Sequence, residues 1–167
     1  RKREGYTRFL HPPIAHAEAS VWMRSDSRAT YQDRHSLLML KGVVRLGSSY
    51  GADYDLFLNR HPRLSLRPDL GDAFAMVAKR QADFFLYDHL RGLLALRQYG
   101  LEGKIIQVDR PFKRNPLYLA ISLQSPCIAL AGRMESELRE MLKPGMVQSL
   151  IRHEIDRYIK QSPARPQ

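Results

Sequence analysis

The stretch Leu46-Gly47-Ser48-Ser49-Tyr50-Gly51 decides how the chain is organised. The apolar run at 42–46 before it predicts a short strand, and residues 52–58 after it predict the first turns of a helix. A Gly/Ser turn between a strand and a helix leaves backbone N–H groups unpaired at the start of the helix, where an anion can bind. The corner therefore predicts a carboxylate or phosphate site. The alternative is that Ser48 or Ser49 only caps the helix.

Strands and helices alternate through the centre of the chain, which predicts an α/β sheet. The strands are expected at 43–46, 64–66, 84–87 and 105–108, and the helices near 50–60, 70–80 and 90–99. Asp88 follows the apolar strand at 84–87. Because ligands of such sheets sit at the carboxyl ends of strands, the glycine turn and Asp88 together predict a cradle for a zwitterion. The turn would take the acid and Asp88 the ammonium group. The alternative is that Asp88 only caps the helix that follows it.

The two ends of the chain have different patterns. Residues 1–13 predict an irregular entry, because Pro12-Pro13 fits neither a helix nor a central strand. A strand is expected at 19–23. Further on, the pattern predicts a strand at 117–123, two amphipathic helices at 130–141 and 147–159, and a mobile tail. The sequence starts at Arg1 without Met or a signal peptide, so we expect a processed or truncated product.

The composition is that of a soluble protein with a basic excess. The 167 residues carry a net charge of +10, most of it on the two flanks of a nearly balanced centre. A basic nucleic-acid-associated protein is one alternative, but no element combines clustered cations with interleaved aromatics. No apolar run approaches the roughly 20 residues of a membrane span. The single cysteine excludes an internal disulfide, and the six histidines lack metal-ligand spacing.

The corner also fits the pattern Gly-x-Ser-x-Gly around Ser49, which marks some hydrolases. Such an enzyme needs an acid and then a histidine later in the chain. The only late candidate is His153, within an amphipathic helix. A catalytic role is therefore not expected.

The order of these features resembles the type II periplasmic solute-binding proteins, in particular the polar amino-acid-binding family of transport systems. The resemblance rests on the order and spacing of motifs over roughly residues 3–160. These motifs are Arg3 with Phe9 and Pro12-Pro13, Lys41-Gly42, Gly47-Ser48-Ser49-Tyr50, Asp83, Phe84 to Asp88, and the strand from Leu117 to Pro126 followed by two helices.

The resemblance implies a periplasmic-binding-protein-like II fold in the α/β class, with one complete α/β lobe plus part of the other. Residues 1–25 would be a remnant of lobe 1 and the first hinge strand, and residues 26–116 lobe 2. Residues 117–160 would form the second hinge strand and the C-terminal helices of lobe 1, and residues 161–167 a flexible tail. The family has most of lobe 1 before the position of Arg3, so we expect a fragment, or a second chain that completes the missing lobe.

The resemblance also implies a function. The ligand would be an amino acid or a similar small polar solute, without a cofactor or metal. Arg3, Ser48, Ser49 and the turn from Gly47 would hold its carboxylate, Asp88 its ammonium group, and Tyr50 would line the cleft. The protein would be periplasmic and would pass the solute to a membrane permease of the ABC type. The alternative within this fold is the extracytoplasmic sensing domain of a signalling receptor.

Overall fold

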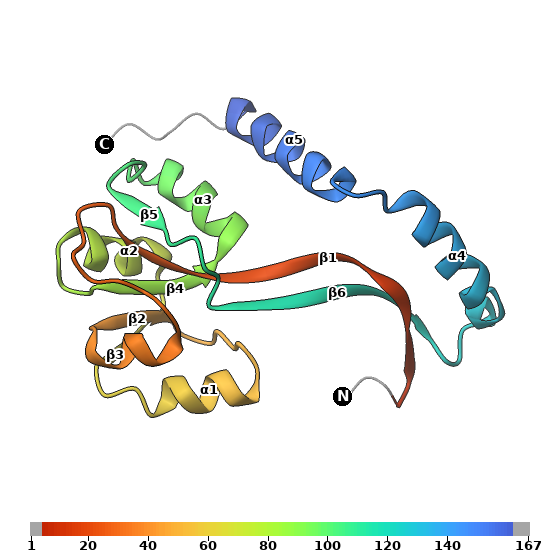
Figure 1. The fold of residues 1–167 in the computed structure, drawn as a ribbon, viewed down its shortest axis with the longest axis horizontal. Helices are drawn as coiled ribbons and strands as arrows, with labels where there is room; N and C mark the ends of the chain where they lie inside the picture. The colour runs from red at the N-terminus through yellow and green to blue at the C-terminus, as the bar shows by residue number, and fades with distance from the viewer. Residues whose placement is uncertain (1–4, 162–167) are drawn as a thin grey trace. The chain divides into compact units, whose positions relative to one another are not determined.

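The structure is a computed structural model and describes residues 5–161. Its elements follow the alternation expected for the centre of the chain (Figure 1). In chain order they are β1 (Thr7–Arg24), η1 (Arg34–Met39), β2 (Gly42–Arg45), α1 (Ala52–Asn59), β3 (Leu64–Arg67), α2 (Leu70–Ala78), β4 (Phe84–Asp88), α3 (His89–Gln98), β5 (Ile105–Gln107), β6 (Lys113–Ser122), η2 (Pro126–Leu130), α4 (Ala131–Met141) and α5 (Met146–Gln161).

The chain forms two compact units. Among the described residues, unit 1 comprises residues 5–17 and Asn115–Gln161, and unit 2 comprises Glu18–Arg114. The strands of unit 2 lie in the order β3-β2-β4-β1-β5, and β6 pairs with β1. β2 runs parallel to β3 and β4, whereas β1 is antiparallel to β4 and β5. The α/β class and the periplasmic-binding-protein-like arrangement are confirmed, and the sheet is mixed rather than wholly parallel.

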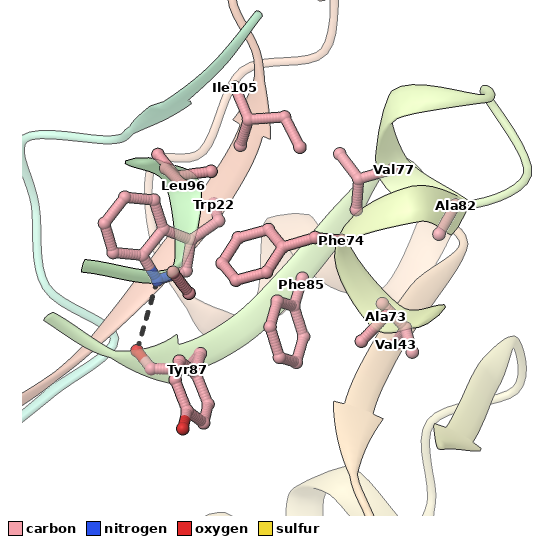
Figure 2. Packing of buried hydrophobic residues seen from close by; sticks show 11 residues of the cluster. Trp22, Val43, Ala73, Phe74, Val77, Ala82, Phe85, Tyr87, Leu96 and Ile105 are labelled. Atoms are coloured by element: carbon pink, nitrogen blue, oxygen red, sulfur yellow. Dashed lines mark hydrogen bonds between the residues drawn. The ribbon is translucent and has the colours of Figure 1, made fainter. Parts of the chain in front are cut away.

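Each face of the unit 2 sheet carries its own apolar core, because successive side chains of a strand point to opposite faces. Phe85 and Tyr87 of β4 join a cluster with α2, α3 and Trp22 of β1. Figure 2 shows this cluster, in which the Phe74 ring meets Phe85 edge-on at 4.9 Å between centroids. Phe84 and Leu86 face the other way, toward η1 and α1.

One expectation for the N-terminal segment is wrong. Pro12 and Pro13 lie inside β1, which begins at Thr7 rather than near residue 19. In this half of β1 the partner strand is β6, since the pairings with β4 and β5 cover only residues 19–24. A strand with an open side tolerates proline, whose missing N–H then leaves no ladder bond unmade.

Candidate functional site

The glycine turn and Asp88 lie at the same edge of the unit 2 sheet. β2 and β4 are parallel neighbours, with Val44 opposite Leu86. The turn begins three residues after Val44, and Asp88 comes two residues after Leu86. The carboxyl ends of the two strands therefore bring both features to one edge, where open α/β sheets bind ligands.

Two glycines shape the corner. Gly47 has φ +80° and Gly51 has φ +94°, values that side chains with a Cβ rarely adopt. Gly51 is the N-cap of α1 and makes no side-chain cap bond. The alternative that Ser48 or Ser49 caps this helix is therefore wrong.

Asp55 of α1 reaches back into the corner and accepts two of its hydrogen bonds. The Ser49 hydroxyl donates to Asp55 Oδ2 at 2.6 Å, and the Tyr50 N–H donates to Oδ1 at 2.7 Å. Partial burial raises the pKa of Asp55, but the bonds from Ser49 and Tyr50 outweigh it and leave the pKa below its ordinary value. Two donors that the sequence assigned to a ligand carboxylate thus already hold a carboxylate of the chain itself. Ala52 and Asp53, in the first turn of α1, keep N–H groups without an intrahelical acceptor.

Lys113 at the start of β6 braces the same corner. Its ammonium group donates to the Tyr50 carbonyl and lies 4.5 Å from the centroid of the Tyr54 ring. It also approaches Gly51 so closely that a Cβ there would lie 2.6 Å from Nζ. The corner is therefore held from below by Asp55 and from β6 by a cation, and Gly51 leaves the space that the cation uses.

Tyr50 ties the corner to the neighbouring strand. Its side chain is buried, and its hydroxyl donates to the Leu86 carbonyl at 2.8 Å. The Phe112 ring packs against it edge-on at 5.7 Å. Burial raises the pKa of Tyr50 to about 12, and the charges of Asp55 and Asp88 act in the same direction. The phenol therefore links the glycine turn to the strand that ends at Asp88.

Asp88 is the N-cap of α3, as the structural alternative proposed. Its Oδ1 accepts the Arg91 N–H at 2.9 Å. Within residues 5–161, no hydrogen bond or ion pair occupies the second oxygen, so the carboxylate can cap the helix and still meet a cation. The neighbouring His89 has a buried Nδ1 atom that finds no partner in the described part of the chain.

The other candidates separate clearly. Arg3 lies outside the described residues. Ser49 donates to a carboxylate, and no hydrogen bond in the described structure joins it to a histidine, so the arrangement is not that of an activated nucleophile. Among residues 5–161, no group of three His, Cys, Asp or Glu side chains could hold a metal ion.

Sequence reasoning missed Asp55 and Lys113. Asp55 lies six residues after Ser49, and a carboxylate one turn into a helix is a common pattern that does not single it out. Lys113 is 63 residues from Tyr50, and only the folded sheet brings the two together.

No protein-family model matches the chain, and no curated protein matches it. Solved structures do match. An ancestral cationic amino-acid solute-binding protein is 22% identical, with a TM-score of 0.62 over 91% of this chain and 63% of that one. The amino-acid ABC transporter substrate-binding protein AbpA from Streptococcus pneumoniae, bound to L-arginine, is 16% identical, with a TM-score of 0.60 over 93% and 63%. A histidine kinase sensor domain with similarity to periplasmic binding proteins is 20% identical, with a TM-score of 0.57 over 92% and 64%.

These matches establish the fold. The chain has the periplasmic-binding-protein-like II fold and spans less than two thirds of each related structure. The related proteins are binding proteins rather than enzymes. Within the described residues, no helix is both long and apolar enough to cross a membrane.

Proposed function

We propose that unit 2 is the ligand-binding lobe of a solute-binding protein for an amino acid or a similar small polar solute, acting by binding rather than catalysis. The observation that carries this proposal is the shared sheet edge, which places a corner rich in N–H groups beside a carboxylate with a free oxygen. The fold shared with amino-acid-binding proteins supports it.

In this proposal the two ends of a zwitterion meet complementary groups. The ligand carboxylate binds at the Gly47–Tyr50 corner, through the Ser48 hydroxyl and the N–H groups at the start of α1, with Arg3 as a further cationic partner. It meets the Ser49 hydroxyl and the Tyr50 N–H only by displacing Asp55, which holds both. Asp88 receives the ammonium group through a charge-assisted hydrogen bond. Tyr50 positions the corner rather than contacting the ligand through its hydroxyl, which is already bonded to Leu86.

We further propose that the protein works in the periplasm and delivers its solute to a membrane permease of the ABC type. A second candidate is a sensing domain of a signalling receptor, which the match to a histidine kinase sensor domain favours. The two differ in what the bound protein does. A transport protein stimulates ATP hydrolysis by its permease, whereas a sensing domain changes the phosphorylation state of its receptor.

Thermal unfolding with each of the twenty amino acids tests the binding role. A ligand at one hundred times its Kd stabilises the folded state by about 2.7 kcal/mol. For a unit of this size that corresponds to a rise in Tm of about 10 °C or more. Salt-sensitive retention on DNA, with no rise in Tm for any amino acid, would instead favour a nucleic-acid-associated protein.

Asp88→Asn tests the role of the carboxylate itself. Asparagine is as good an N-cap as aspartate, so the stability of the ligand-free protein should change by less than about 0.5 kcal/mol. Loss of the charged acceptor should weaken amino-acid binding by about 10- to 100-fold, the equivalent of a hydrogen bond to a charged group. Asp72→Asn, at an exposed carboxylate in the first turn of α2, is the matched control. Equal affinities for the two variants would remove Asp88 from the site.

A further inference from the structure

Unit 1 buries very little of its apolar surface. Of the 22 buried hydrophobic residues among residues 5–161, only Leu10 and Ala131 belong to unit 1. Over half of the large exposed hydrophobic side chains belong to it: Tyr6, Leu117, Leu119, Leu123, Leu130, Met141, Leu150 and Tyr158. Apolar surface must leave water to offset the entropy lost on ordering a chain, and unit 1 provides almost no such burial within itself.

The exposed side chains gather around a groove between β6 and α4. The groove has a volume of about 330 Å³ and is lined by leucines and methionines with one cation and one carboxylate: Leu119, Leu130, Arg133, Met134, Glu137, Leu138 and Met141. Its walls are held in place from β1, because Glu135 of α4 accepts hydrogen bonds from the Arg8 side chain and the His11 N–H, both at 3.1 Å. The groove is therefore a formed surface.

The strands beside the groove are open at their edges. The Leu123 N–H donates to the Tyr6 carbonyl, so the end of β6 lies beside the start of β1 (Figure 1). In the described part of unit 1 these two strands pair only with each other. A two-stranded ribbon is marginally stable alone and offers unpaired N–H and C=O groups to a further strand.

The charge of this region indicates what kind of molecule covers it. Residues 115–161 carry six Lys and Arg against five Asp and Glu, so they take little part in the net charge of +10. A nearly neutral, apolar surface fits another protein surface rather than a nucleic acid or an anionic membrane. Each related structure also has more than a third of its length outside the match, which is room for a further α/β layer.

We propose that unit 1 is a docking surface for an α/β segment that lies outside residues 5–161. The segment adds a strand to an open edge of the β1–β6 ribbon and seats apolar side chains in the groove between β6 and α4. Strand addition of this kind supplies affinity through main-chain hydrogen bonds, and the groove supplies specificity. This proposal does not depend on the solute-binding role of unit 2.

Cross-linking in the cells that make the protein tests the identity of the occupant. A photo-reactive amino acid replaces Leu119 in the groove, and a control replaces Leu66 on β3 of unit 2, which is also exposed. We expect cross-links from position 119, and not from 66, to map to an α/β segment, either elsewhere in the same polypeptide or in a separate chain. Cross-links from 119 to α4 of a second copy, with a purified mass twice the 19.3 kDa of the chain, would overturn the proposal in favour of self-association.

Hydrogen exchange supplies the second readout. Amides of β6 and α4 should exchange at least tenfold more slowly in the native assembly than in the purified 167-residue chain, whereas those of β4 should be unchanged. Leu119→Glu combined with Met134→Glu should abolish this protection, and Leu66→Glu should leave it intact. Protection of β6 and α4 in a purified monomer equal to that of β4 would show that the surface needs no partner. Equal exchange in the two preparations, with no cross-link, would also contradict the proposal.

Discussion

Asp55 is the residue on which the geometry of the corner depends. Its two carboxylate oxygens take the Ser49 hydroxyl and the Tyr50 N–H, and Lys113 adds a cation to the same turn. The corner thus carries an internal carboxylate at the place where the sequence predicted an external one. A ligand carboxylate must use the remaining donors or displace Asp55.

Asp55→Asn should destabilise the protein by about 1–2 kcal/mol, because a charged acceptor is lost and the amide group faces the Ser49 hydroxyl. Urea unfolding at pH 7 measures the difference. Asp53→Asn, an exposed neighbour in the same first turn, should change stability by less than about 0.5 kcal/mol.

The same pair gives a pH dependence with a defined sign. The pKa of Asp55 is lowered in the folded protein, so its contribution is present above the unfolded value of about 3.9 and is lost as the pH falls through the lower folded value. The difference between the wild type and Asp55→Asn should be constant from pH 5 to 8 and shrink below pH 4. A difference that grows on acidification would contradict the assignment.

Tyr50→Phe tests the link between the corner and β4. The variant leaves the buried Leu86 carbonyl without its donor, at a cost of about 1–3 kcal/mol. Because the folded pKa of Tyr50 is raised to about 12, the contribution of its hydroxyl should be complete below pH 10 and lost as the pH rises through 12. Unfolding midpoints of the two proteins between pH 7 and 10 check this, and a difference that already falls at pH 8 is the contrary result.

At the scale of helices and strands, the packing of α3 on β1 depends on a glycine. A Cβ on Gly92 would lie 2.2 Å from Trp22 Cζ2 and 2.5 Å from Cε2, so the helix approaches the indole ring more closely than any other residue permits. The indole N–H in turn donates to the Tyr87 carbonyl (Figure 2). The glycine therefore sets the distance between helix and sheet next to Asp88.

Gly92→Ala should lower the free energy of unfolding by about 1–3 kcal/mol, the usual cost of overpacking, in spite of the better helix propensity of alanine. Gln98→Ala, at an exposed position of the same helix, should be neutral or slightly stabilising. Urea unfolding followed by tryptophan fluorescence measures both, since Trp22 is the only tryptophan. Stabilisation by Gly92→Ala would show that the ring moves aside freely.

The elements of unit 2 could be predicted from local patterns. The apolar run at 84–87 and the caps at Asp69 and Asp88 mark strand and helix ends that the structure confirms. The length of β1 could not be predicted, because proline excludes a central strand but not one with an open side, and only the fold shows which side is open. Asp55 and Lys113 depend on how side chains reach across a turn and between distant strands, which no spacing in the sequence reveals.

At the scale of the whole molecule, the two units have opposite characters. Unit 2 has two complete apolar cores and a ligand-type edge, and unit 1 has an open ribbon and an apolar groove. The central claim is that the edge of unit 2 formed by the Gly47–Tyr50 corner and Asp88 binds a small zwitterion.

Amide chemical shifts of the ¹⁵N-labelled protein, recorded while an amino acid is added, test this claim most directly. If the account is right, at least one amino acid moves the resonances of Ser48, Ser49, Ala52 and Asp88 in a saturable manner, and Asp88→Asn weakens that response about 10- to 100-fold. Saturable shifts confined to the opposite edge of the sheet, or no shift with any amino acid at millimolar concentration, would contradict it.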